Sequence, residues 1–238
     1  MSRITVVEYT DPGCVWSWGS EPQLRWLRDT YGDQLDWRRV FGVQVDDASR
    51  SFPDRDVDTD GDRWREDWLV VAETTGAPVP ERLEWFHRST RPAAEAARAA
   101  EAQGPEIADR VLLRLREAVF VGGRPADTPA RIAEALADVP GLDLPRLLTD
   151  AESGAVKASV QADFEETRRP HPAVIGRTGP GPNPGAARQD GDHLRYSFPT
   201  LIITGPGGEQ VVSGWNDRDA LEAAVLAAGA RSTADTTA

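Results

Sequence analysis

The sequence of 238 residues contains one cysteine, one methionine and one lysine. Because a single cysteine, Cys14, cannot form a disulfide within the chain, nothing in the sequence indicates an oxidising compartment. No apolar run approaches the roughly 18 residues that a membrane-spanning helix needs. The run that follows Arg3 is also shorter than the apolar region of a signal peptide. We therefore expect a cytoplasmic protein with no membrane partner.

Clusters of basic charge are missing as well. The chain has 39 acidic residues against 27 basic ones, for a formal charge of −12. Since nucleic-acid binding depends on clustered Lys and Arg, we expect no nucleic-acid partner. The three histidines, His87, His171 and His193, have no metal-ligand spacing, so no metal is expected. Of these, His87 precedes an alanine-rich segment and could reach a pocket.

The first fifth of the chain predicts a strand, a helix and a second strand. Residues 4–10 are β-branched and apolar, and they end at the turn signal Asp11-Pro12-Gly13. Leu24, Leu27 and Tyr31 then recur at helical spacing. Residues 35–43 alternate well enough to form the second strand. This βαβ unit would place its two strands parallel in one sheet.

The middle of the chain predicts a block of helices. Residues 46–63 are acidic and read as a solvated loop; their alternating aspartates lack the glycine and glutamate offsets of a calcium-binding loop. From residue 64 to about 167, apolar residues recur at helical spacing through five or six segments. No convincing strand interrupts them, so we expect a contiguous all-helical insertion.

The last part of the chain returns to strands. Residues 170–192 are rich in Gly and Pro and predict a long loop. Residues 198–204 and 209–212 predict a hairpin, and residues 219–228 a final helix capped by Asn216-Asp217. The predicted organisation is an α/β domain from residues 1–48 and 193–230, a helical insertion at 62–170, a Gly/Pro-rich loop at 171–192 and a disordered tail at 231–238.

Three motifs resemble a known family. The segment from Asp11 to Gly19, DPGCVWSWG, is similar to the D-P-x-C-P-W-C-x-x-G motif of DsbA-like proteins. The segments 89–93 and 115–120 look like that family's alanine-rich helices and R-E-A-F-F-like run, and 198–201 like its cis-proline strand. The chain thus resembles the FrnE-like or 2-hydroxychromene-2-carboxylate-isomerase-like group of the thioredoxin superfamily. This resemblance implies a thioredoxin-like fold interrupted by the helical insertion.

The resemblance also implies site residues. Cys14 matches the first active-site cysteine, whereas Val15 stands in place of the family's proline and Ser17 in place of its second cysteine. The catalytic residues expected are Cys14 and Ser17, with Ser17 donating a hydrogen bond to the thiolate. The expected substrate-binding residues are Pro12, Val15, Trp16, Trp18, Phe198 and Pro199, although core packing would equally explain Trp16 and Trp18.

The chemistry expected from the resemblance is that of a single thiol. A cysteine at a helix N-terminus faces unpaired backbone N–H groups, which favour the thiolate and predict a lowered pKa. Without a second cysteine, Cys14 cannot expel a mixed disulfide by itself. We therefore expect a thiol–disulfide oxidoreductase with no tightly bound cofactor, which uses glutathione or mycothiol as co-substrate. Its substrate would be a small thiol or a protein disulfide, and its state a monomer or homodimer.

Two other functions remain open. Kappa-class glutathione transferases and chromene-carboxylate isomerases share the fold, and a similar protein would activate a bound thiol. In those relatives a serine occupies the first position of the motif, whereas Ser17 occupies the fourth. The third interpretation is a redox-inactive thioredoxin-like adaptor, and the missing second cysteine motivates it.

Overall fold

The computed structural model describes residues 3–51, 54 and 56–232, which form two compact units. The sheet unit comprises Met1–Thr10, Gly19–Val40 and Glu165–Ala238, and the helical unit comprises Asp11–Trp18 and Phe41–Phe164. The chain therefore leaves the sheet unit after residue 10 and re-enters it at residue 19, within the first helix. It leaves again after residue 40 and returns at residue 165. The segment that carries Cys14 belongs to the helical unit.

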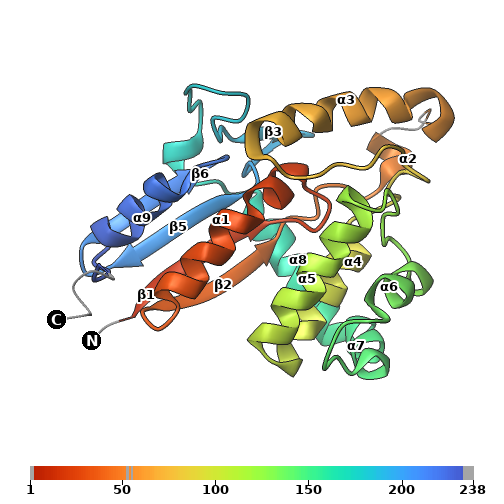
Figure 1. Ribbon diagram of the computed structural model, residues 1–238, viewed down its shortest axis with the longest axis horizontal. Helices are drawn as coiled ribbons and strands as arrows, with labels where there is room; N and C mark the ends of the chain where they lie inside the picture. The colour runs from red at the N-terminus through yellow and green to blue at the C-terminus, as the bar shows by residue number, and fades with distance from the viewer. Residues whose placement is uncertain (1–2, 52–53, 55, 233–238) are drawn as a thin grey trace. The chain divides into compact units, whose positions relative to one another are not determined.

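The sheet unit is built on four strands in the order β2-β1-β5-β6 (Figure 1). These are β1 (Ile4–Thr10), β2 (Leu35–Phe41), β5 (Thr200–Gly205) and β6 (Gly208–Ser213). β1 pairs antiparallel with β5, and β5 pairs antiparallel with β6 in the predicted hairpin. The strand-helix-strand opening and the closing hairpin thus share one sheet, as a thioredoxin-like fold requires.

Two helices supply the apolar core of this unit. α1 (Val15–Tyr31) contributes Leu24 and Leu27, and α9 (Arg218–Ala227) contributes Leu221 and Val225 to one buried cluster. Alternate residues of the strands complete it, since side chains on one face of a strand recur every second residue. Asp217 caps α9 by accepting a hydrogen bond from the Ala220 N–H, as its sequence position predicts. The core residues of β1 and β5 are Ile4, Val6, Leu201 and Ile203.

The helical unit packs around α4 (Arg91–Ala100), whose alanines are all buried. Small side chains allow neighbouring helices to approach closely while keeping high helix propensity. Residues of α4, α5 and α7 share one apolar cluster. The α-helices of this unit are α2 (Ala48–Ser51), α3 (Val57–Thr75), α4, α5 (Pro105–Phe120), α6 (Pro129–Leu136), α7 (Leu144–Ala151) and α8 (Gly154–Thr167, which ends in the sheet unit), with a 3-10 turn at Glu101–Gln103.

The acidic segment predicted as a loop is largely helical. α2 covers Ala48–Ser51, and α3 begins at Val57, so Asp58, Asp60 and Asp62 lie in a helix rather than a loop. Asp56 caps α3 by accepting from the Asp58 N–H. Acidic residues in the first turn favour a helix N-terminus, which explains how so polar a segment becomes helical.

The Gly/Pro-rich segment also contains regular structure that the sequence did not predict. A 3-10 turn covers Pro172–Val174, and Arg188–Asp190 (β3) pairs antiparallel with His193–Arg195 (β4). Most of the predicted tail, residues 233–238, lies outside the described residues. Among the helices that are described, none is long and apolar enough to cross a membrane.

Candidate functional site

Cys14 lies in the turn that joins β1 to α1. Its N–H donates to the Asp11 carbonyl at 3.2 Å, and its own carbonyl accepts from the Trp18 N–H at 3.0 Å. The latter is the first hydrogen bond of α1, which begins at Val15. Cys14 is therefore the residue at the helix N-terminus, where backbone N–H groups are left without helical partners.

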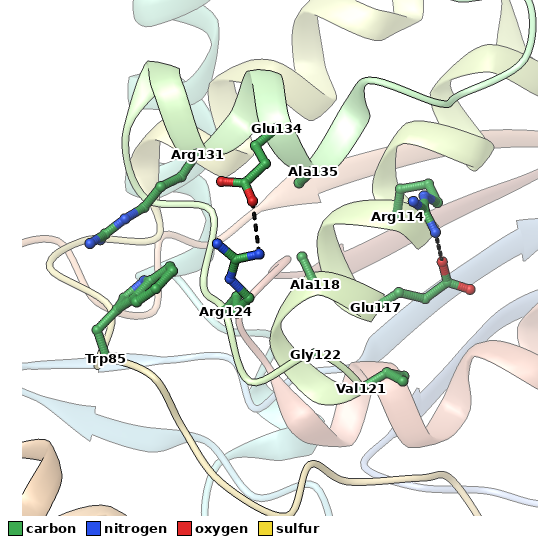
Figure 2. Close-up of a pocket in the computed structure, with 10 residues that line it drawn as sticks. All are labelled: Trp85, Arg114, Glu117, Ala118, Val121, Gly122, Arg124, Arg131, Glu134 and Ala135. Carbon is green, nitrogen blue, oxygen red and sulfur yellow. Dashed lines mark hydrogen bonds and ion pairs between the residues drawn. The ribbon is translucent and has the colours of Figure 1, made fainter.

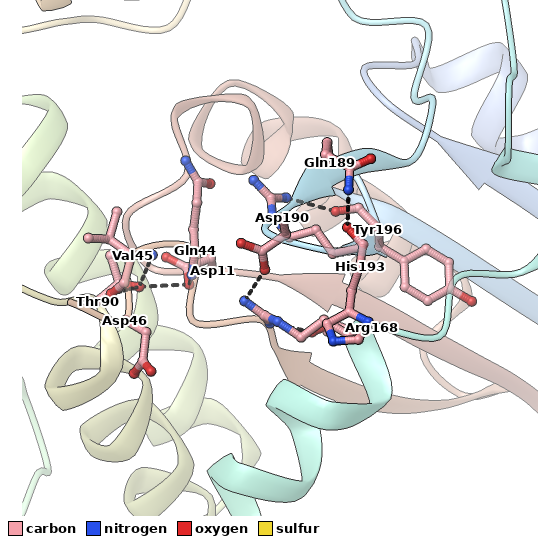
Figure 3. Close-up of polar contacts among 12 residues, drawn as sticks. Asp11, Gln44, Val45, Asp46, Thr90, Arg168, Gln189, Asp190, His193 and Tyr196 are labelled. Atoms are coloured by element: carbon pink, nitrogen blue, oxygen red, sulfur yellow. Dashed lines mark hydrogen bonds and ion pairs between the residues drawn. The ribbon is translucent and has the colours of Figure 1, made fainter. Parts of the chain in front are cut away.

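The buried carboxylate of Asp11 holds this turn in place. One of its oxygens accepts from the Gly13 N–H at 2.7 Å, and the other accepts from the Gln44 N–H at 2.7 Å and the Thr90 hydroxyl at 3.0 Å. Figure 3 shows Asp11 next to Gln44 and Thr90. Since Asp11 is fully buried, these donors replace the water that a carboxylate needs. These hydrogen bonds connect the β1–α1 turn to the segment that follows β2 and to the N-terminus of α4.

Thr90 and Gly13 fit tightly against each other. The Thr90 N–H donates to the Val45 carbonyl at 2.7 Å, and its hydroxyl also accepts from the Val45 N–H at 3.3 Å. A side chain on Gly13 would place its Cβ 2.6 Å from Thr90 Cγ2 and 3.1 Å from His87 Nε2. Because real Cβ atoms do not approach this closely, any other residue at position 13 would force Thr90 to shift. His87 and Thr90 therefore form the wall beside the Cys14 turn.

Cys14 is almost fully enclosed, with 5% of its surface exposed. Burial raises the pKa of its thiol, and the charge of Asp11 acts in the same direction. The Ser17 backbone and hydroxyl and the Trp16 backbone lower the pKa but do not outweigh burial. The lowered pKa expected from the helix N-terminus is therefore wrong for this state of the protein: desolvation of the anion exceeds the stabilisation by the helix.

Ser17 lies in the first turn of α1 and is fully buried. Its hydroxyl has no hydrogen-bond partner among the described residues. Its backbone and its hydroxyl are both close enough to Cys14 to lower the pKa of the thiol. The serine that replaces the family's second cysteine can therefore favour the Cys14 thiolate, but a hydroxyl cannot form a disulfide.

His87 adds a neutral imidazole to the wall of the site. It is 8% exposed, and burial lowers its pKa to about 4, although the charge of Asp127 opposes this shift. At neutral pH the ring is uncharged, so it carries both a donor and an acceptor nitrogen. The sequence indicated that His87 could reach a pocket, and the structure places its Nε2 against Gly13.

The remaining predicted site residues fall in different surroundings. Trp18 is 8% exposed, packs against Phe120 and Trp68, and donates from Nε1 to the Pro78 carbonyl at 2.8 Å. It is a core residue. Pro12 is buried beside Cys14, whereas Val15 and Trp16 are half-buried in the first turn of α1.

Phe198 and Pro199 belong to the sheet unit rather than to the unit that holds Cys14. Phe198 is 3% exposed, and the Phe198–Pro199 peptide bond is cis. Pro199 is also buried and borders a small cavity with Ser20 and Asn216.

Three contributors to the site were not assigned from the sequence: Asp11 as an anchor, Thr90 as its partner and Gly13 as a tight fit. Asp11 and Gly13 were visible as parts of a turn signal, and Thr90 as part of the Ser-Thr-Arg-Pro segment. Nothing local indicates that residues 79 positions apart share a hydrogen bond. Within the described part of the chain, no group of three His, Cys, Asp or Glu side chains is arranged to hold a metal ion.

Comparison with known proteins agrees with the fold. A protein family described as thioredoxin matches residues 8–169. The ClpXP adapter protein SpxH of Shouchella clausii is 24% identical over 169 residues, which are 69% of this chain and 53% of SpxH. The chain therefore matches about half the length of this relative.

Solved structures give the same result at low identity. A putative protein disulfide isomerase from Nitrosomonas europaea has a TM-score of 0.68 at 19% identity, covering 94% of this chain and 96% of that one. The cytosolic disulfide reductase DsbM from Pseudomonas aeruginosa has a TM-score of 0.60 at 20% identity, covering 88% and 89%. A further structure of DsbM contains GSH. The predicted DsbA-like, thioredoxin-like fold is confirmed.

Proposed function

Because the chain belongs to the thioredoxin family that matches residues 8–169, we propose that it is a thiol–disulfide oxidoreductase that acts through Cys14 as a single thiol. The observation that carries this proposal is the position of Cys14 at the N-terminus of α1, where the Ser17 hydroxyl one turn later is near enough to lower the pKa of the thiol. Both features stabilise the thiolate, which is the form that attacks disulfides.

The proposed reaction has two exchange steps. The Cys14 thiolate attacks one sulfur of a disulfide, which forms a mixed disulfide on Cys14 and releases the other sulfur as a thiolate that takes up a proton. A second thiol, deprotonated, then attacks the mixed disulfide and restores the Cys14 thiolate. Across the two steps one half of the substrate disulfide is released as a thiol, and the other half leaves as a mixed disulfide with the external thiol. A second molecule of external thiol then attacks that mixed disulfide, so complete reduction of the substrate to two thiols oxidises two external thiols to their disulfide. An external thiol is required because Ser17 cannot take this role.

Glutathione is the co-substrate that the comparisons favour, since a DsbM structure contains GSH; mycothiol is the alternative low-molecular-weight thiol. Pro12, Val15 and Trp16 lie next to Cys14 along the chain and are the proposed contacts for the substrate near the sulfur. Phe198 and Pro199, which were also expected from the sequence to contact the substrate, stay a prediction. A cytoplasmic location suits this reaction, because glutathione keeps thiols reduced there.

The buried thiol defines the resting state in this proposal. With 5% of its surface exposed and a raised pKa, Cys14 reacts slowly until the turn opens enough to admit a sulfur. The hydrogen bonds from Ser17 and from the backbone N–H groups of α1 then stabilise the thiolate that attacks. The rate of disulfide exchange would then be limited by how often a substrate sulfur reaches Cys14, rather than by the pKa of the thiol.

A second function, that of a redox-inactive adaptor, is favoured by one specific observation. The relative that matches at 24% identity is named as a ClpXP adapter protein, and enclosure of a neutral Cys14 is compatible with a protein that binds rather than reacts. An adaptor would use its surface and leave Cys14 as a core residue, so Cys14→Ser would leave its binding intact.

The two functions are separated by intact-protein mass spectrometry. The reduced protein is incubated with oxidised glutathione at pH 8, and the expected result is one glutathione adduct per chain, located on Cys14 and removed by reduced glutathione. Cys14→Ser is the matched control and should gain no adduct. Absence of an adduct on the wild-type protein after hours at millimolar oxidised glutathione would reject the oxidoreductase and favour the adaptor.

A further inference from the structure

A second cavity lies within the helical unit, at the C-terminal end of α5 and beside α6 (Figure 2). Its volume of about 480 Å³ falls in the range of small-molecule sites. Trp85, Ala118, Val121 and Ala135 form its apolar surface. Val121, at the end of α5, is 51% exposed and offers apolar surface at the mouth of the cavity.

The aromatic wall of this cavity is held rigid. Trp85 Nε1 donates to the Pro125 carbonyl at 2.9 Å, and the guanidinium of Arg131 lies 3.9 Å from the centre of the Trp85 ring. Arg131 is itself held by an ion pair of 2.6 Å with Asp127, whose side chain is fully buried. A wall fixed by three contacts loses little conformational freedom when a ligand binds to it.

The charged side of the cavity, in contrast, holds an ion pair that a ligand anion can replace. Arg124 forms an ion pair of 2.8 Å with Glu134, and both side chains are more than half exposed, at 52% and 58%. Exposed pairs of this kind contribute little free energy. A ligand carboxylate or sulfonate could therefore replace Glu134 at Arg124 while Glu134 turns to water. Figure 2 shows this pair directed across the cavity next to Trp85.

The arginine in the exchangeable pair indicates the sign of the ligand. Three arginines and two glutamates line the cavity. Arg114 is paired with Glu117 at 3.1 Å and Arg131 with the buried Asp127, which leaves Arg124, in its exposed pair, as the guanidinium that a ligand anion reaches most readily. Arginine binds planar oxyanions through two parallel hydrogen bonds and also stacks on aromatic rings.

We propose that this cavity binds a small amphipathic organic anion, in which an aromatic or other flat apolar body packs between Trp85 and Ala118 and a carboxylate or sulfonate pairs with Arg124. This site is separate from Cys14 and does not depend on the proposed oxidoreductase function. It would bind its ligand whether or not Cys14 reacts.

The test uses 8-anilinonaphthalene-1-sulfonate, a fluorescent aromatic sulfonate, with the full-length folded protein. We expect saturable binding of one molecule per chain, with a dissociation constant of about 10–100 μM, typical for a ligand of this size. Arg124→Gln should weaken binding about tenfold by removing the anion's partner. Glu134→Gln should tighten it several-fold, because Arg124 then has no competing carboxylate.

Two controls keep this test specific. Ala118→Trp, at a half-buried helix position, should abolish binding by filling the cavity, whereas Arg146→Gln, which breaks the exposed pair Arg146–Asp150, should change nothing. N-phenyl-1-naphthylamine, the uncharged analogue, should bind more weakly and should not respond to Arg124→Gln. Thermal melts and binding by Cys14→Ser establish that each variant folds and that the site is independent of Cys14.

The proposal is overturned by any of four results. The first three are no saturable binding of the sulfonate to the wild-type protein, binding that survives Ala118→Trp, and loss of binding in Arg146→Gln equal to that in Arg124→Gln. The fourth is equal affinity for the uncharged analogue, because the site would then be apolar rather than selective for an anion.

Discussion

At the scale of single residues, the environment of Cys14 is a competition between burial and hydrogen bonding. Desolvation raises the pKa of the thiol, while the Ser17 hydroxyl and the backbone N–H groups of Trp16 and Ser17 lower it. Removing one of the opposing contacts should therefore shift the balance further toward the neutral thiol. The same reasoning applies to His87, where burial outweighs the charge of Asp127.

Alkylation of Cys14 by iodoacetamide measures this competition. Because the pKa of Cys14 is raised, the rate should reach its midpoint above the roughly 8.5 of a free cysteine. Ser17→Ala should move the midpoint to still higher pH, since it removes a hydrogen bond to the thiolate. Ser20→Ala, at another buried serine of α1, serves as the control and should leave the midpoint unchanged. A wild-type midpoint at or below pH 7 would contradict the enclosed resting state.

His87 makes stability depend on pH. Its pKa in the folded protein is about 4, against about 6.5 in the unfolded chain. Below pH 6.5 the unfolded state binds a proton that the folded state does not, so the free energy of unfolding decreases as the pH is lowered. By pH 4 the free energy of unfolding is about 3 kcal/mol lower than it is above pH 6.5, where the neutral ring contributes its full stabilisation.

This loss can be isolated with urea denaturation at pH 7 and pH 4.5. His87→Gln should reduce the difference in unfolding free energy between the two pH values by about 2 kcal/mol relative to the wild type. His193→Gln, at an exposed histidine, should reduce it little. If both variants gave the wild-type difference, the buried neutral imidazole would be refuted.

At the scale of elements, the turn between β1 and α1 depends on Asp11 and its donors. Thr90 is 1% exposed, and its hydroxyl donates to Asp11 and accepts from the Val45 N–H. Thr90→Val should cost about 1–3 kcal/mol of unfolding free energy, because the shape is kept and two buried polar groups lose a partner. Thr149→Val, at an exposed helix position, should change it by about 0.5 kcal/mol or less. Equal effects in chemical denaturation would show that the Asp11 anchor contributes nothing.

The first turn of α1 offers a gain-of-function prediction. Residues three apart in a helix have Cα atoms about 5 Å apart, within the range that a disulfide spans. Ser17→Cys should therefore form a disulfide with Cys14 and acquire disulfide reductase activity toward insulin with dithiothreitol. Ser20→Cys is the control, because a position six residues from Cys14 lies about 9 Å along the helix and is too distant. No disulfide in Ser17→Cys would mean that position 17 is not placed as in dithiol relatives.

Local sequence signals predicted the elements that surround Cys14 more accurately than the contacts between them. The apolar run Ile4–Thr10 and the hairpin ending at Ser213 form the strands expected of them. The acidic run near Asp58 was assigned to a loop on composition, but the cap at Asp56 allows a helix. Composition alone cannot reveal such a start, because a cap depends on backbone geometry as well as residue type.

The buried carboxylate of Glu8 was also not predictable from sequence periodicity. Glu8 lies in β1 where alternation predicts an apolar residue, and it is fully buried. It accepts from Trp37 Nε1 at 2.8 Å and from Arg39 Nε at 3.2 Å, both on β2. A buried carboxylate is tolerated only with such partners, and sequence periodicity does not identify them. The prediction of a lowered pKa for Cys14 was wrong for a related reason. The helix N-terminus, which lowers the pKa, is visible in the local sequence, whereas burial, which raises it, depends on the whole fold.

At the scale of the whole molecule, the chain divides into a sheet unit and a helical unit, and the first strand and the Cys14 turn fall on different sides of that division. The predicted thioredoxin-like fold with a helical insertion is confirmed, whereas the domain boundaries proposed from the sequence stay a prediction. Two separate sites result from the account: the Cys14 turn, and the cavity beside Trp85.

The central claim is that Cys14 turns over as a single thiol with an external thiol as co-substrate. Steady-state reduction of hydroxyethyl disulfide by reduced glutathione, coupled to glutathione reductase and NADPH, tests it most directly. We expect a rate proportional to the concentration of wild-type protein, which falls to the uncatalysed background in Cys14→Ser and is reduced in Ser17→Ala. A wild-type rate equal to the background, or an undiminished rate in Cys14→Ser, would contradict it.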